Sequence, residues 1–90
     1  MTEKLVLDEK LNTATAARLA EQMSAMEGKD VSLDASGVTF LGGLALQVLV
    51  AARKSCAAAG HVFEVTPRSD AFDEALVLAG FRPDDFDKEQ

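Results

Sequence analysis

Asp34-Ala35-Ser36-Gly37-Val38-Thr39-Phe40-Leu41-Gly42-Gly43-Leu44-Ala45-Leu46-Gln47-Val48-Leu49 is the stretch that decides the fold of this 90-residue chain. It follows a short apolar segment at residues 31–33 and passes through two adjacent glycines into the most apolar part of the sequence. This order predicts a buried strand, a sharp turn and then a helix. Residues 40–44, at the turn itself, carry no acid, no nucleophile and no metal ligand.

The predicted helix after the turn, residues 43–59, is apolar over well over half of its circumference. At 100° per residue, the centre of this face is formed by Ala45, Leu49, Ala52 and Cys56. Such a helix packs on two sides or offers surface to a partner. If the flank made by Leu46 and Val50 is uncovered, it favours self-association. A homodimer is therefore one of the alternatives.

The segments before this helix predict a strand at residues 4–7, near a sheet edge, and a turn or abbreviated strand at residues 8–11. Asn12 or Thr13 is expected to cap the next helix. Its apolar stripe consists of Ala16, Leu19, Ala20, Met23 and Met26, and Gly28 suits the left-handed position after its end.

The segments after it predict a strand at residues 61–66, stopped by Pro67, and a last helix that Ser69 caps and Gly80-Phe81 closes. The order of elements predicts an α/β fold: about four strands in a mixed sheet, with three main helices mostly on one face. We expect one domain over residues 1–83 and an acidic C-terminal tail over residues 84–90, of which Phe86 can tuck in against the domain.

The net charge of −6 and the sequence pI of about 4.6 disfavour nucleic acid and anionic lipid as partners, since both need clustered Lys and Arg. No apolar run of 18 residues predicts a membrane span, and the first residues do not resemble a signal peptide. The single Cys56 fits a reducing compartment. We therefore expect a cytoplasmic domain without direct membrane insertion.

The residues that could carry chemistry are few, so we expect no enzyme, no cofactor and no metal. His61 and Cys56 are interpreted as structural residues. Asp34 is either a functional carboxylate or, as we favour, an acceptor of hydrogen bonds from its own turn. Gly42-Gly43 is either an anion or nucleotide site or, as we favour, a tight turn.

The chain as a whole resembles the STAS domain, the domain of bacterial anti-sigma-factor antagonists and of sulfate-transporter tails. The resemblance rests on the Asp34–Leu49 stretch, on residues 11–16 before the first helix, and on residues 67–72 followed by Leu76 and Gly80-Phe81. It implies a compact STAS-like fold that binds another protein. The departure lies at the turn, because the family's phosphoacceptor serine falls on Gly43, which has no hydroxyl group.

The resemblance also suggests partners. The segment from Leu41 to Leu49 is most similar to short STAS proteins encoded beside bacterial chemotaxis genes, which implies a histidine kinase or related ATPase as partner. Alternatives are the cytoplasmic STAS subunit of a lipid-transporting ATP-binding-cassette (ABC) system and a phosphorylated anti-sigma-factor antagonist. The expected partner-binding residues are Thr39, Leu41, Gly42, Gly43, Leu44, Gln47, Arg68 and Ser69.

Overall fold

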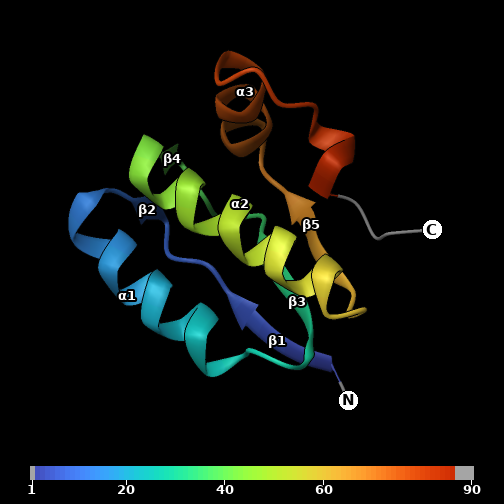
Figure 1. Cartoon of the computed structure of the whole chain (residues 1–90). Coiled ribbons are helices and arrows are strands. Elements are labelled where there is room, and N and C mark those ends of the chain that lie inside the picture. The colour runs from blue at the N-terminus through green and yellow to red at the C-terminus, as the bar shows by residue number, and fades with distance from the viewer. Residues whose placement is uncertain (1, 87–90) are drawn as a thin grey trace.

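A computed structural model describes residues 2–86 of the chain (Figure 1). Its strands are β1 (Thr2–Val6), β2 (Lys10–Leu11), β3 (Asp30–Ala35), β4 (Phe40–Leu41) and β5 (Phe63–Arg68). Its helices are α1 (Thr13–Ala25), α2 (Gly43–Ala58), α3 (Asp70–Leu78) and the short 3₁₀ helix η1 (Pro83–Phe86). The compact α/β arrangement predicted from the sequence is confirmed.

The strands form two small sheets instead of one. The larger sheet has the order β1-β3-β5, and β2 pairs with β4 in a separate two-stranded sheet. Every pairing among the described residues is parallel, so the expected mixed sheet is corrected to parallel pairs. In the register of the larger sheet, Leu5 lies opposite Leu33 and Leu33 lies opposite Val65. The predicted edge position of the first strand is confirmed.

The helices α1 and α2 lie side by side on the same side of the larger sheet, while α3 and η1 lie toward one end of the molecule (Figure 1). Residues of β3 alternate accordingly: Val31, Leu33 and Ala35 are buried beneath the helices, and Ser32 and Asp34 point the other way. This arrangement agrees with the prediction, made from the order of elements, that the helices lie mostly on one face.

Helix α1 begins where the sequence predicts. The Asn12 side chain accepts a hydrogen bond from the Thr15 backbone at 3.0 Å, and the Thr15 hydroxyl accepts one from the Asn12 backbone at 2.9 Å. This reciprocal capping satisfies two otherwise free backbone donors. Of the predicted stripe, Ala16 and Leu19 are buried and the two methionines are partly buried against the core, but Ala20 is exposed.

Helix α2 buries only part of the predicted face, since Ala52 and Cys56 are partly buried. Ala45, Leu46 and Leu49 are buried, and Gln47 and Lys54 point to solvent. The flank of Leu46 and Val50 that would have favoured a homodimer is covered within the chain, because Leu46 is buried and Val50 packs against the core.

Strand β5 differs from the prediction. It begins at Phe63, not at residue 61, and continues through Pro67 to Arg68. Proline has no backbone N–H to give to a sheet, but β5 is an outer strand and needs ladder bonds on one side only. The register with β3 also shifts between Leu33 and Ala35, beside the proline. Proline therefore interrupts this strand less than it would a central one.

The C-terminal end of α3 closes as predicted. The Phe81 N–H donates to the Leu76 carbonyl at 2.9 Å, and the N–H of Gly80, which has a positive φ, donates to the Val77 carbonyl at 3.0 Å. These two bonds define a Schellman motif.

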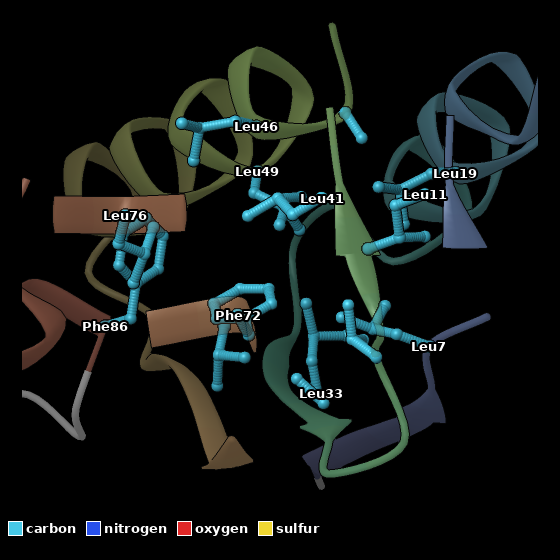
Figure 2. Close-up of a cluster of buried hydrophobic side chains, with 14 of the residues drawn as sticks. Leu7, Leu11, Leu19, Leu33, Leu41, Leu46, Leu49, Phe72, Leu76 and Phe86 are labelled. Atoms are coloured by element: carbon cyan, nitrogen blue, oxygen red, sulfur yellow. The ribbon is translucent and has the colours of Figure 1, made fainter. Parts of the chain in front are cut away.

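The core extends past the domain boundary expected at residue 83. Phe86 in η1 is fully buried. The centroid of its ring lies 6.4 Å from the ring centroid of Phe72 and 6.4 Å from that of Phe81, and both pairs have edge-on geometry. Figure 2 shows Phe86 beside Leu76 and Phe72, at one end of the hydrophobic cluster. Of the acidic tail expected at 84–90, Asp84 and Asp85 belong to η1, and residues 87–90 lie outside the described residues.

We predict that Phe86→Ala lowers the free energy of unfolding by about 3–5 kcal/mol, because it empties a fully buried aromatic site. Urea unfolding followed by circular dichroism measures the change. The matched control is Leu78→Ala, whose side chain is 83% exposed and whose loss should cost no more than about 0.5 kcal/mol. A cost for Phe86→Ala as small as the control's would mean that η1 does not complete the core.

Candidate functional site

The candidate site is the corner where β4 turns into α2, and Gly42 fixes its shape. The Gly42 N–H donates to the Leu11 carbonyl at 2.9 Å, and the Gly42 carbonyl accepts the first hydrogen bond of α2, from Leu46 at 3.0 Å. A Cβ atom at Gly42 would lie 3.2 Å from the Leu11 carbonyl oxygen and 3.2 Å from the Phe40 ring. The glycine therefore allows the chain to pass close to β2 as it enters the helix.

Gly43 has no such neighbour. It is the first residue of α2, it is exposed, and nothing lies within 4 Å of the place where a Cβ atom would stand. Its surface is therefore open to a partner, and the fold does not require glycine there.

Four of the predicted partner-binding residues are exposed at the corner. Thr39, Gly43, Leu44 and Gln47 are all exposed. Leu44 and Gln47 are three residues apart in α2, and Gly43 and Gln47 are four apart, so they lie on one helix face. Leu44 is a large apolar side chain that stays 52% exposed.

Phe40 belongs to the same corner, although it is not among the residues that the sequence predicts to bind a partner. Its ring is 52% exposed and lies over Gly42. Neighbouring strand residues point to opposite faces, so Phe40 and Leu41 cannot both point into the core. That alternation indicates that one of the two residues is exposed, but it does not identify which one.

Leu41, Arg68 and Ser69 were also predicted to bind a partner, but they are engaged within the chain. Leu41 is buried beneath the corner. The Arg68 side chain is only 12% exposed, and it donates to Asp73 at 2.6 Å and to the Val65 carbonyl at 2.8 Å.

Ser69 joins two segments of the corner. Its hydroxyl donates to the Val38 carbonyl at 2.5 Å and accepts from the Phe72 backbone N–H at 3.1 Å. It therefore caps α3, as predicted, and at the same time holds the loop that leads to Thr39. Ser69 and Arg68 therefore support the corner from within the chain, and their contact with a partner stays a prediction.

Asp34 behaves as the favoured interpretation expects. Its Oδ1 atom accepts hydrogen bonds from the Ser36 hydroxyl at 2.7 Å and from the Ser36 N–H at 2.9 Å. These two bonds, the side-chain bond first, lower the pKa of the Asp34 carboxyl below its usual value. The carboxylate thus holds the turn after β3 and is not poised as a base.

His61 and Cys56 lie at other places in the fold. His61 Nδ1 lies 3.3 Å from Asp30 Oδ1, which also accepts the Val62 N–H at 2.8 Å. The Val62 bond, followed by the contacts with His61, lowers the pKa of Asp30. Partial burial, and then the negative charge of Asp30, raises the pKa of the Cys56 thiol, so this cysteine is a poor nucleophile.

Within residues 2–86 there is no cluster of three His, Cys, Asp or Glu side chains that could hold a metal ion. An open groove of about 680 Å³ runs between α1 and α2 and is lined mainly by apolar side chains, including Met23, Met26 and Cys56. None of the helices in the same part of the chain has the length and apolar character that a membrane crossing needs.

We predict opposite effects of alanine at the two glycines of the corner. Gly42→Ala should lower the free energy of unfolding by about 1 kcal/mol, because the new methyl group meets a backbone carbonyl that is held in the β2–β4 pairing. Gly43→Ala should leave stability unchanged or raise it by up to about 1 kcal/mol, since alanine there is unhindered and restricts the unfolded chain. Urea unfolding of the two variants tests this, and equal effects would contradict the assigned packing.

We predict that Ser36→Ala raises the pKa of Asp34, because it removes the shorter of the two hydrogen bonds to the carboxylate. A carboxyl whose pKa is lowered by folding stabilises the folded chain above its unfolded pKa of about 3.9. That stability is lost as the pH falls through the folded pKa. The stability difference between wild type and variant should therefore be present at neutral pH and shrink in strong acid. Carboxyl-carbon NMR titration measures the pKa, and an unchanged value would contradict the assignment.

Comparison with known proteins supports the architecture described above. Residues 2–82 match the family model described as "Mlab, STAS domain". A search of curated proteins and a search of solved structures each gave no significant match. STAS domains in general are modules that bind other proteins, and they include the anti-sigma-factor antagonists. Because the match covers nearly all of the described residues, this chain belongs to the STAS domain family.

Proposed function

We propose that this chain is a non-enzymatic protein-binding module whose contact surface is the α2 corner, defined as Thr39, Phe40, Gly43, Leu44 and Gln47. The observation that carries the proposal is the exposure of Phe40 and Leu44, each 52% exposed, around a glycine with free space above it. Exposed apolar side chains of this size contribute binding free energy when a partner covers them, at about 25 cal/mol per Å² of apolar surface.

The shape of the α2 corner suits a protein partner. Gly43 lets a partner approach the backbone of α2 closely, and Gln47 and Thr39 offer hydrogen-bonding groups at the rim. The rigid support beneath, from buried Leu41 and the Ser69–Val38 hydrogen bond, keeps this surface in place before binding. A preformed surface loses less conformational entropy on association.

The proposed module works without the family's phosphorylation switch. Gly43 stands at the position where the resemblance places the phosphoacceptor serine. The hydroxyl nearest in the sequence, that of Thr39, lies four residues before Gly43 and donates to the Glu9 carbonyl at 3.2 Å. Ser55 lies three turns into α2. The corner is therefore proposed to be constitutively available for binding.

The proposed partner is a histidine kinase or related ATPase of a chemotaxis array, in the cytoplasm, on the resemblance of residues 41–49 to STAS proteins encoded with chemotaxis genes. A second candidate is the cytoplasmic STAS subunit of a lipid-transporting ABC system, which the sequence Gly42-Gly43-Leu44-Ala45-Leu46 also resembles. The missing hydroxyl disfavours a third, a phosphorylated anti-sigma-factor antagonist. Capture of a soluble kinase or of a membrane-bound ATPase complex separates the first two.

We predict that Gly43→Arg and Leu44→Glu each weaken partner capture about tenfold or more, because each places a charged side chain in the centre of the apolar contact. Both positions are exposed, so the variants should fold. The measurement is an affinity pull-down from native lysate with the full chain as bait. Lys54→Glu, exposed on the same helix but eleven residues beyond Gly43, is the matched control and should capture the partner normally.

Two results would overturn the proposal. Normal capture by both corner variants would place the interface elsewhere. Stoichiometric transfer of phosphate from ATP to this chain by a cognate kinase would show that a phosphorylation switch is present despite Gly43.

A further inference from the structure

A second cavity, of about 400 Å³, lies away from the α2 corner, ten residues further along α2. It is enclosed by the second half of α2, the start of β5 and η1, and Arg53 and His61 are among its lining residues. Its volume falls within the range of small-molecule sites. We call it the Arg53 pocket.

Arg53 differs from the other arginines of the chain. Arg18, Arg68 and Arg82 each form an ion pair with an aspartate. Arg53 forms no hydrogen bond or ion pair with any residue in the described range 2–86. Its Nε atom is buried and has no hydrogen-bond partner. The site thus holds a partly buried cation that has no ion-pair partner among residues 2–86.

The position of this cation is nevertheless fixed. The guanidinium carbon of Arg53 lies 5.4 Å from the centroid of the Phe86 ring, within cation–π distance. Phe86 itself is fully buried in the core. A guanidinium close to a ring keeps its planar fork of N–H donors, which matches the two oxygens of a carboxylate.

The other residues that line the Arg53 pocket restrict the kind of ligand that can bind there. Ala57, Val62 and Phe63 contribute an apolar wall. Asp85 also lines the cavity, and its carboxylate accepts the Arg82 N–H at 3.2 Å. His61 adds an imidazole whose Nδ1 atom faces Asp30. Because Asp85 repels negative charge, a singly charged anion suits this cavity better than a phosphate dianion.

We propose that the Arg53 pocket binds a small organic monocarboxylate, with the carboxylate on the Arg53 guanidinium and a short apolar chain against Val62 and Phe63. The ligand would supply the counter-ion that Arg53 lacks among residues 2–86. This site is independent of the α2 corner and requires no chemistry beyond binding.

The test is a titration of the full ¹⁵N-labelled chain with sodium hexanoate, followed by NMR. Saturable shifts are expected for the amides of residues 60–63, 85 and 86, with Arg53→Gln weakening the affinity about tenfold or more. Hexanol, which has the same chain length without the charge, and inorganic phosphate should each bind about tenfold more weakly. Lys54→Gln removes the same charge from the next residue and should bind hexanoate like wild type.

Two further variants keep the test decisive. Arg53→Lys retains the positive charge but loses the fork, so weaker binding in a normally folded variant supports the proposal even if Arg53→Gln unfolds. Asp85→Asn should tighten hexanoate binding about threefold by removing a repelling charge. Absence of saturable shifts, equal binding of hexanol, or unchanged affinity in both Arg53 variants would overturn it.

Discussion

The carbonyl group of Ala35, at the end of the central strand, is the point on which the positions of the surrounding segments depend. It accepts hydrogen bonds from the Val38 N–H at 3.2 Å and from the Ser69 N–H at 3.0 Å. The first bond reverses the chain after β3, and the second ties that turn to the start of α3. Ala35 is fully buried, so these bonds are protected from water. The path from Val38 to the α2 corner therefore starts from a fixed position.

Much of the fold could be predicted because local and tertiary preferences agree there. Asn12 caps α1 with its own side chain, and the Gly80-Phe81 pair ends α3 through backbone bonds that a short sequence encodes. The strand through Pro67 could not be predicted, since the cost of a missing N–H depends on whether the strand is central or outer. The burial of Phe86 likewise depends on partners distant in the sequence, Phe72 above all.

The α2 corner could be located from its glycines, but its surface could not be assigned residue by residue. Sequence position placed Arg68 near the corner, yet only the structure shows that Asp73 and the Val65 carbonyl occupy its donors. Phe40 shows the reverse: it was left out of the predicted surface, because an aromatic residue in an apolar segment is usually buried, yet it is exposed. A two-residue strand offers too short a pattern to decide which face is dry.

The two adjacent glycines of the corner differ in whether the packing around them leaves room for a side chain. A side chain at Gly42 would press on the Leu11 carbonyl, so the close pairing of β2 and β4 favours glycine at that position. Gly43 has open space around it and a helical backbone, so packing would accept serine there. The absence of a hydroxyl at Gly43, where the resemblance places the family's phosphoacceptor, is therefore not a consequence of the fold. In the proposed function, this absence changes the surface that a partner meets, from a group whose charge can be altered to an uncharged backbone flanked by Phe40 and Leu44.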